Sequence, residues 1–479
     1  MTLDSSICYR ALRARDARFD GRFFVAVSST RIYCRPVCTV KPPKRENCRF
    51  FPSAAAAESS GYRPCLRCRP ELAPGNASVD ATTRLAQAAA SMMEDATLDQ
   101  AGLDALAARL GITDRHLRRA FGAEFGVSPV EFAQTQKLLL AKRLLTDTVL
   151  PVTEVAFASG FGSVRRFNAL FKRRYRLRPS QLRRDAPSAA AADVLGFELS
   201  FRPPFDWPAV SAFLGARAIA GVEAVQDGGY RRTVRIPGDG KEHSGWIAVE
   251  VSPKKPTLRV AVSASLAKAL PPVLSRVKGL MDLACHPAEV AQALGALARR
   301  HPGLRVPGAF DGFEIAVRAI LGQQVTVAAA RTVAGRFAAA FGDPVATPFD
   351  SLTTLFPTAA QVAGLPPGRI ARLGMPGARA RTVVALARAV ADGRLALVPN
   401  ADIDATLETL RALPGVGEWT AQYIAMRALS WPDAFPHTDL GVMKALGETD
   451  ARRVLAAGEA WRPWRAYAVM HLWQSLKKE

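Results

Sequence analysis

The stretches LPGVGEWTAQYIA (residues 413–425) and FPHTDLGVMKAL (435–446) decide the fold of the C-terminal part of the chain. Gly415 and Gly417 predict a tight turn between two helices, because glycine reaches backbone conformations that other residues avoid. Such a helix-hairpin-helix directs backbone N–H groups at a phosphate. Alone, the hairpin predicts only nonspecific DNA binding. Asp439 adds a carboxylate about twenty residues further on.

Working outward from the hairpin, residues 301–479 are predicted to be all-α, with breaks near 303–308, 364–368 and 414–417. Residues 193–300 have a different pattern of polar and apolar residues. The segments LGFELSFRPPFDW, TVRIP, GWIAVEV and TLRVAVS alternate in polarity and contain β-branched residues. They predict a small antiparallel β domain of the TBP-like kind.

Residues 80–185 contain an internal repeat. Ala107 and Gly111 are spaced like Ala156 and Gly160, so an Ala-x3-Gly turn recurs after 49 residues. This predicts an all-α domain with two helix-turn-helix units. A recognition helix is expected after each turn, with these candidates for DNA contact: Arg115, Arg118, Arg165 and Arg166. Phe161, Phe167 and Phe171 are predicted to be core residues. Use of the units for protein contacts alone is the alternative.

Four cysteines have the spacing of a metal site. Cys34 and Cys38 lie in YCRPVC, and Cys65 and Cys68 lie in RPCLRC. C-x3-C followed by C-x2-C predicts one tetrahedral Zn²⁺. Spacing alone favours a purely structural zinc site over chemistry at sulfur. The fifth cysteine of this region, Cys48, is expected to be a small buried side chain rather than a ligand.

Length, charge and hydropathy narrow the class of protein. The chain has 479 residues, 49% of them hydrophobic, and a formal charge of +22. Residues 1–185 hold 31 Lys and Arg against 17 Asp and Glu, which favours a polyanionic partner such as nucleic acid. No signal peptide or long apolar run is visible, so a cytoplasmic, nucleoid-associated protein without a membrane partner is expected.

Polar linkers at 71–79 and 186–193 divide the chain into four predicted domains. Together they make a multidomain α+β protein. The domains are a four-cysteine zinc domain (1–75), a double helix-turn-helix domain (80–185), a small antiparallel β domain (193–300) and a helix-hairpin-helix domain (301–479).

The stretch FFVAVSSTRIYCRPVCTVKPPKRENCRFF, with GYRPCLRC, resembles the Ada-type zinc domain over residues 5–71. The resemblance implies that Cys34 is both a zinc ligand and the acceptor of a methyl group from a DNA phosphotriester. Zinc keeps the thiolate deprotonated, and methylation removes a negative charge that repels phosphate. The basic residues expected to contact phosphates are Arg35, Lys41, Lys44, Arg45, Arg63 and Arg67.

Residues 80–185 resemble the AraC-type DNA-binding domain, most closely in AFASGFGSVRRFNALFKRRYRLRPSQLRR. This resemblance implies a transcription activator. Its partners would be promoter DNA, as double-stranded DNA, and RNA polymerase.

Residues 194–479 resemble AlkA-type 3-methyladenine DNA glycosylases of the helix-hairpin-helix superfamily. FRPPFDWPAVSAFLGARA, FEIAVRAILGQQVTVAAARTVAGRF, RLGMPGARA and WRPWRAYAVMHLW carry the match. The resemblance implies that Asp439 is catalytic and that Trp419, Tyr423 and Trp473 form the base pocket, where aromatic faces favour a cationic alkylated purine. Gln324 stands where the family inserts an apolar wedge, so an altered base preference is expected.

Two absences complete the prediction. Relatives that cleave the strand carry a lysine where this chain has Trp419, so a monofunctional hydrolase that uses water is expected. No C-terminal four-cysteine set for an iron–sulfur cluster is present. Cys285, in ACHP, is rejected as an acceptor of methyl groups from guanine O6.

The sequence therefore predicts a monomer that joins alkylation sensing, activation of transcription and base excision repair. The alternative is a damage-responsive regulator whose glycosylase half only binds DNA.

Overall fold

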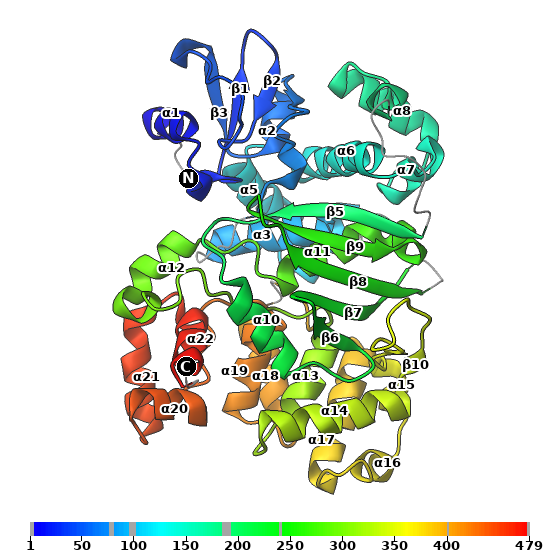
Figure 1. Ribbon diagram of the computed structural model, residues 1–479, viewed down its shortest axis with the longest axis vertical. Coiled ribbons are helices and arrows are strands. Elements are labelled where there is room, and N and C mark those ends of the chain that lie inside the picture. The colour runs from blue at the N-terminus through cyan, green and yellow to red at the C-terminus, as the bar shows by residue number, and fades with distance from the viewer. Residues whose placement is uncertain are drawn as a thin grey trace. The chain divides into compact units, whose positions relative to one another are not determined.

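The computed structural model describes residues 4–75, 81–94, 102–183, 193–238, 242–399 and 402–476 (Figure 1). It is a multidomain α+β structure, as predicted, and divides into two compact units. The first holds residues 1–203, 252–275 and 283–286, and the second holds 204–251, 276–282 and 287–479. The division does not follow the predicted linker at 186–193, of which only Asp193 lies among the described residues.

The first unit begins with a four-stranded sheet in the order β3-β1-β2-β4. Its strands are β1 (Phe24–Val27), β2 (Ile32–Cys34), β3 (Cys48–Phe51) and β4 (Arg63–Pro64). β1 is antiparallel to β2 and β3, whereas β4 runs parallel to β2. Residues on β1 alternate between two cores: Val25 faces the core with helix α1 (Ser5–Ala14), and Phe24 faces the core with α2 (Ala54–Ser59).

The described part of the first unit continues with seven helices. They are α3 (Ala81–Glu94), α4 (Gly102–Arg109), α5 (Asp114–Phe125), α6 (Pro129–Asp147), α7 (Val152–Ala158), α8 (Val164–Tyr175) and α9 (Pro179–Leu182). Gly111 (φ +67°) lies in the turn between α4 and α5, and Gly160 (φ +81°) lies in the turn between α7 and α8. The predicted repeat of two helix-turn-helix units is therefore confirmed. So is the core prediction for three aromatic residues, which are all buried: Phe161, Phe167 and Phe171.

A buried acid ties the zinc-ligand strand to the helix-turn-helix region. Glu58, on α2, accepts hydrogen bonds from the hydroxyls of Tyr33 on β2 (3.0 Å) and Tyr175 on α8 (3.2 Å). Its other oxygen accepts one from Thr135 on α6, at 3.3 Å. Burial raises the pKa of Glu58 to about 7, although these donors act to lower it. One carboxyl group thus contacts three separate elements.

The first unit also contains two strands from beyond the predicted linker. β5 (Val194–Ser200) pairs antiparallel with β9 (Thr257–Ser263), with Phe197 opposite Val260. They are followed by η5 (Ala264–Ala269) and the first residues of α11 (Leu270–Leu280).

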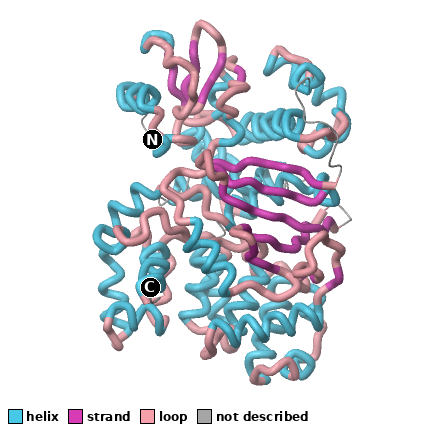
Figure 2. Tube along the Cα trace, viewed as in Figure 1, coloured by secondary structure: helices cyan, strands magenta, loops and turns pink. Residues whose placement is uncertain are grey.

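The second unit contains three antiparallel strands in sequence: β6 (Glu223–Gln226), β7 (Gly229–Ile236) and β8 (His243–Val251). Strands β5, β7, β8 and β9 lie where the sequence predicts them, whereas β6 and the two-residue strands β10 (Asp343–Pro344) and β11 (Thr354–Leu355) were not predicted. From α12 (Pro287–Leu294) onward the chain is almost entirely helical, as predicted (Figure 2). Among the described residues, no helix combines the length and apolar character needed to cross a membrane.

The remaining elements of the second unit are α10 (Trp207–Ala216), η6 (Gly295–Ala298), α13 (Gly312–Leu321), α14 (Val327–Phe341), β10 (Asp343–Pro344), β11 (Thr354–Leu355), α15 (Ala359–Ala363), α16 (Pro367–Ala371), α17 (Gly377–Ala391), α18 (Ile403–Ala412), α19 (Glu418–Arg427), α20 (Leu440–Leu446), α21 (Ala451–Gly458), η7 (Glu459–Trp461) and α22 (Arg465–Ser475).

Candidate functional sites

The four predicted metal ligands converge at one end of the small sheet. The sulfur atoms of Cys34, Cys38, Cys65 and Cys68 all lie within 4.8 Å of one another, and no other group of this kind occurs among the described residues. Zn–S bonds of about 2.3 Å in a tetrahedron place sulfurs roughly 3.8 Å apart, so the quartet fits Zn²⁺. The parallel pairing of β2 with β4 explains this geometry, because Cys34 ends β2 and Cys65 follows β4.

The thiols of this site influence one another strongly. A hydrogen bond with Cys34 lowers the pKa of Cys38 to about 7, and hydrogen bonds with its three neighbours raise the pKa of Cys34. Exposure does not single out the predicted acceptor: Cys34 is 7% exposed, and Cys68 is the more exposed ligand. The backbone N–H of Arg35 donates to the sulfur of Cys68 at 3.4 Å.

Two expectations around the quartet were wrong. The Arg35 side chain is buried, and its Nε donates to Asp20 Oδ1 at 2.8 Å, so it is not a free phosphate ligand. Cys48 is half-buried rather than buried, because it begins β3 at the margin of the sheet, and its thiol donates to the carbonyl of Lys44. Arg45 and Arg67, in contrast, have exposed side chains.

The recognition-helix arginines are all exposed. Arg115 and Arg118 lie in the first two turns of α5, and Arg165 and Arg166 lie in the first turn of α8. Arg118 pairs with Asp114 at 2.7 Å, one helical turn earlier. Exposure leaves these guanidinium groups accessible to a duplex, and the core aromatics on the opposite helix face hold the helices in place.

In the second unit, the predicted hairpin joins α18 to α19. Gly415 has φ +85°, and a Cβ at this position would lie 2.3 Å from Thr382 Oγ1. The Thr382 hydroxyl donates to the carbonyl of Pro414 at 2.7 Å and so holds the turn against α17. Gly417 precedes α19 without a side-chain cap, which leaves the N–H groups of this helix end available to an anion.

Asp439 caps α20 and is held by two tryptophans. Its Oδ1 accepts hydrogen bonds from Trp473 Nε1 (2.8 Å) and from the backbone N–H of Val442 (2.9 Å). Its Oδ2 accepts one from Trp419 Nε1 at 2.7 Å. Three donors therefore orient the carboxylate, and both indole rings belong to the predicted base pocket.

The predicted pocket residues form an aromatic cluster. Trp419 stacks on Tyr423, with ring centroids 5.4 Å apart, and Tyr423 lies 6.3 Å from Trp473. The sequence prediction missed Phe213 on α10, which stacks on Trp473 at 6.3 Å. Phe213 belongs to the motif FRPPFDWPAVSAFLGARA, but the spacing of residues in the sequence does not predict that α10 lies beside the hairpin.

Two further missed residues are cations. Arg217 lies 3.8 Å from the centroid of the Phe213 ring, and Arg427 lies 4.9 Å from it. Arg427 also donates to the Tyr423 hydroxyl at 2.9 Å. Burial acts to raise the pKa of Tyr423, but the neighbouring guanidinium charges, led by that of Arg427, outweigh it and lower the pKa.

Four protein families match the chain in sequence order. They are "Metal binding domain of Ada" (residues 7–71), "Helix-turn-helix domain" (106–185), "AlkA N-terminal domain" (196–311) and "HhH-GPD superfamily base excision DNA repair protein" (317–453).

One relative matches nearly the whole chain. The protein named "Probable bifunctional transcriptional activator/DNA repair enzyme AlkA" from Mycobacterium tuberculosis is 41% identical over 99% of this chain and 97% of its own. This chain belongs to the Ada–AlkA fusion family.

Two Escherichia coli proteins are similar to parts of the fusion. DNA-3-methyladenine glycosylase 2 is 35% identical over 58% of this chain and 96% of its own. The bifunctional transcriptional activator/DNA repair enzyme Ada is 35% identical over 28% of this chain and 36% of its own. The fusion therefore combines a zinc-binding helix-turn-helix regulator with a DNA glycosylase, and it serves DNA alkylation repair and its regulation on double-stranded DNA.

In the fusion protein, the residue predicted to act as the wedge lies in a turn that is held by hydrogen bonds. Gln324 is exposed and adopts φ +55° in the turn that follows α13. Its neighbour Gln323 donates through Nε2 to the carbonyl of Gly415 and to Thr420 Oγ1, both at 2.9 Å. Arg379 on α17 donates to the carbonyl of Gln323 at 2.6 Å. The turn is therefore hydrogen-bonded directly to the hairpin.

Cys285 lies away from all of these sites in the sequence. It is 1% exposed, and its carbonyl accepts a hydrogen bond from Arg202. A side chain with so little exposure does not offer a nucleophile to a base in DNA.

Proposed function

We propose that the glycosylase half hydrolyses the N-glycosidic bond of alkylated bases of the 3-methyladenine type, with Asp439 as its catalytic carboxylate. The observation that carries this proposal is the orientation of Asp439 by Trp419 and Trp473, the two indoles of the aromatic cluster. A carboxylate next to aromatic faces suits a reaction in which a flipped base leaves a sugar that gains positive charge.

The reaction follows from this arrangement. The bond between the base and C1′ breaks, and its electron pair leaves with the base, which neutralises a cationic alkylated purine. The Asp439 carboxylate stabilises the positive charge that develops on the sugar. Water then adds to C1′ and loses a proton to this carboxylate or to solvent. Because Trp419 occupies the lysine position of strand-cleaving relatives, no Schiff base forms and the enzyme is monofunctional.

We propose that the base pocket is lined by Trp419, Tyr423 and Trp473 and that Gln324 enters the duplex. The indole faces favour a cation by about 0.5–2 kcal/mol. The guanidinium groups above Phe213 oppose this preference. Gln324 would fill the gap left by the flipped base by hydrogen bonding, with the braced turn holding it in position.

For the regulator half, we propose that Cys34 accepts a methyl group from a methyl phosphotriester in the DNA backbone. When zinc is bound, its charge keeps the cysteines as thiolates at neutral pH. The Cys34 sulfur attacks the methyl carbon, the C–O bond breaks, and the phosphodiester leaves as an anion. Cys38, Cys65 and Cys68 complete the ligand set.

The loss of one negative charge at the zinc site would strengthen DNA binding and activate transcription. Arg45 and Arg67 would contact phosphates, and the exposed arginines of α5 and α8 would read the promoter. We further propose RNA polymerase as the partner, a monomer as the active state, and domain boundaries at 1–75, 80–185, 193–300 and 301–479.

Base release and methyl transfer test the two halves separately. Wild-type protein should release free base from methylated DNA, and Asp439→Asn should release it about 10²–10³ times more slowly; release by neither protein would favour a regulator that only binds DNA. After exposure to methylated DNA, mass spectrometry should find one methyl group on Cys34. Cys34→Ser should lack this group, and Cys48→Ser, outside the quartet, should keep it. A methyl group on Cys68 instead would reassign the acceptor.

A further inference from the structure

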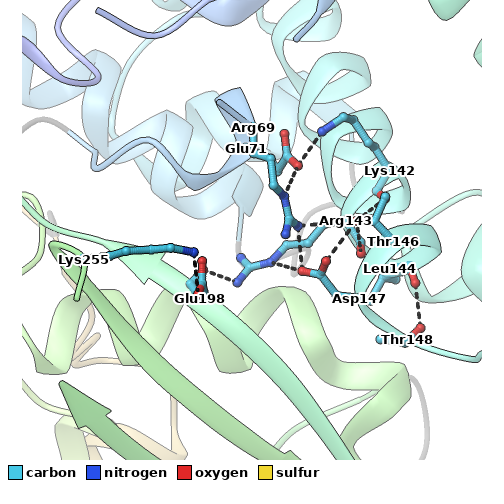
Figure 3. Close-up of polar contacts among 10 residues, drawn as sticks. All are labelled: Arg69, Glu71, Lys142, Arg143, Leu144, Thr146, Asp147, Thr148, Glu198 and Lys255. Atoms are coloured by element: carbon cyan, nitrogen blue, oxygen red, sulfur yellow. Dashed lines mark hydrogen bonds and ion pairs between the residues drawn. The ribbon is translucent and has the colours of Figure 1, made fainter. Parts of the chain in front are cut away.

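A buried charge cluster covers the free side of strand β5. It consists of Arg69 and Glu71, just after the last zinc ligand, and Lys142, Arg143 and Asp147 on α6 (Figure 3). Lys142 Nζ lies 2.5 Å from Glu71 Oε1, and Arg69 bridges Glu71 (3.1 Å) and Asp147 (2.7 Å). We name these five residues the α6 charge cluster. Lys142 and Glu71 are almost fully buried, with 1% and 3% of their side chains exposed.

The α6 charge cluster contains three cations and two carboxylates. Arg69 pairs with both acids and Lys142 pairs with Glu71, whereas Arg143 lies 3.7 Å from Asp147 and is itself only 4% exposed. A buried cation without sufficient partners is strongly destabilising, so Arg143 needs a further electron-rich group. A hydrogen-bond acceptor or an aromatic ring is therefore expected on the side of the cluster that Arg143 faces.

Strand β5 supplies that partner. Arg143 Nη2 donates to the backbone carbonyl of Glu198, and its guanidinium carbon lies 4.9 Å from the centroid of the Phe197 ring. β5 is the last strand in its sheet, so its outer backbone groups are free of strand pairing. Lys255 on the far side pairs with the Glu198 carboxylate at 3.4 Å but is 62% exposed. Arg143 thus satisfies a carbonyl group that a strand edge otherwise leaves to water.

A second buried arginine makes a contact in the opposite direction. Arg202, just after β5, is 1% exposed, and its Nη2 donates to the carbonyl of Gly75 at 2.7 Å. Its Nη1 donates to the carbonyl of Ala284 at 3.1 Å. Gly75 lies just beyond residues 7–71, which match the Ada metal-binding family, so Arg202 joins the end of the zinc domain to a segment of the AlkA-type half.

We propose that the α6 charge cluster is a docking surface for strand β5, through which the regulator half holds the AlkA-type half without needing the linker. The occupant is strand β5 of this same chain, because Arg143 and Arg202 make backbone-directed contacts from both sides. The proposal does not depend on either chemical activity. It implies that strand β5 stays bound to the regulator half whether or not the linker is intact.

The test uses the full chain with a protease site inserted between Ala189 and Ala190. The folded protein is cut, and the fragments are run on a size-exclusion column at micromolar concentration in 0.1 M and 1 M NaCl. The fragments should co-elute at both salt concentrations, because buried charges are screened much less than exposed ones. Separation of the cut wild-type fragments, or separation only in 1 M NaCl, would overturn the proposal.

Three variants locate the interface. Arg143→Met keeps the apolar stem and removes the charge, and it should weaken fragment association at least tenfold. Arg202→Met should weaken association from the other side. Lys255→Met is the matched control, because its exposed ion pair with Glu198 contributes little. Circular dichroism and zinc content of the uncut variants establish that each one folds.

If Arg143→Met does not fold, Arg202→Met and the salt comparison decide the outcome. Unchanged association in every folded arginine variant would contradict a docking surface built on these residues.

Discussion

Replacing Asp439 by Asn separates the chemical role of the carboxylate from its structural role. Asparagine caps helices about as well as aspartate, so α20 should keep its N-terminal hydrogen bond to Val442. The carboxylate accepts from three donors, whereas an amide offers only one acceptor oxygen. If that oxygen faces Val442 and Trp473, the new NH₂ group faces the indole N–H of Trp419.

The structural part of the change is therefore modest. One partly buried indole N–H loses its acceptor, which costs about 1–3 kcal/mol, and the lower end applies because solvent reaches the site. The catalytic part is larger. Removing a preorganised group that stabilises transition-state charge typically lowers the rate by about 10²–10³, or about 2.7–4 kcal/mol. Activity should therefore fall much further than stability.

Single-turnover release of methylated purines from alkylated duplex DNA measures the rate, and chemical denaturation measures the free energy of unfolding. Asp450→Asn is the matched control. Asp450 also caps a helix, α21, through the N–H of Arg452, but it is exposed and receives no indole bond in the described structure. It should match wild type in both assays.

A rate for Asp439→Asn within threefold of wild type, with folding intact, would refute the reasoning. The double variant Asp439→Asn/Trp419→Phe provides a second check. Phenylalanine has no N–H to clash with the amide. The double variant should therefore lose less unfolding free energy than the two single variants lose in sum. Simple additivity would contradict the orientation inferred for the amide.

Four further perturbations test other parts of the structure. Trp419→Phe, which keeps an aromatic face but removes one donor to Asp439, should lower base release roughly tenfold while duplex binding changes little; equal losses in both would assign Trp419 to binding alone. Glu58→Gln should remove a pH dependence of stability. Between the ordinary pKa of 4.5 and about 7 the folded protein holds a proton that the unfolded chain has lost, so wild-type stability falls as pH rises. The fall amounts to about 3 kcal/mol, and denaturation at pH 5 and pH 8 should find it in wild type only. Zinc removal by a chelator should unfold the N-terminal sheet and abolish methyl transfer to Cys34, and added Zn²⁺ should restore both if the quartet is the metal site. Gln323→Leu should lower base release with little change in the unfolding free energy, because it frees the wedge turn from the hairpin; full activity in this variant would show that the brace is dispensable.

The local features of this protein were predictable because each depends on residues close together in sequence. Ala107 with Gly111 and Ala156 with Gly160 predicted both helix-turn-helix turns, and both glycines have the positive φ expected. The cysteine spacing predicted a metal site, and the four sulfurs converge. The expectation for Cys48 was wrong because a strand end at the sheet margin looks the same in sequence as one in the core.

The candidate active site was predictable only in part. Asp439, Trp419, Tyr423 and Trp473 lie together, as their resemblance to a family implies. Phe213, by contrast, comes from a helix about two hundred residues upstream, and its place beside the hairpin depends on how α10 packs.

Sequence by itself determined the four clustered cysteines, the two helical repeats and the hairpin glycines, because spacing and backbone freedom are local properties. The tertiary structure alone decided which charges share a buried environment. Arg35 became a buried partner of Asp20 rather than a phosphate ligand, and Arg143 meets Glu198 across a predicted domain boundary. Burial of an ion depends on groups distant in sequence, because a charge leaves water only where the folded chain supplies it with partners.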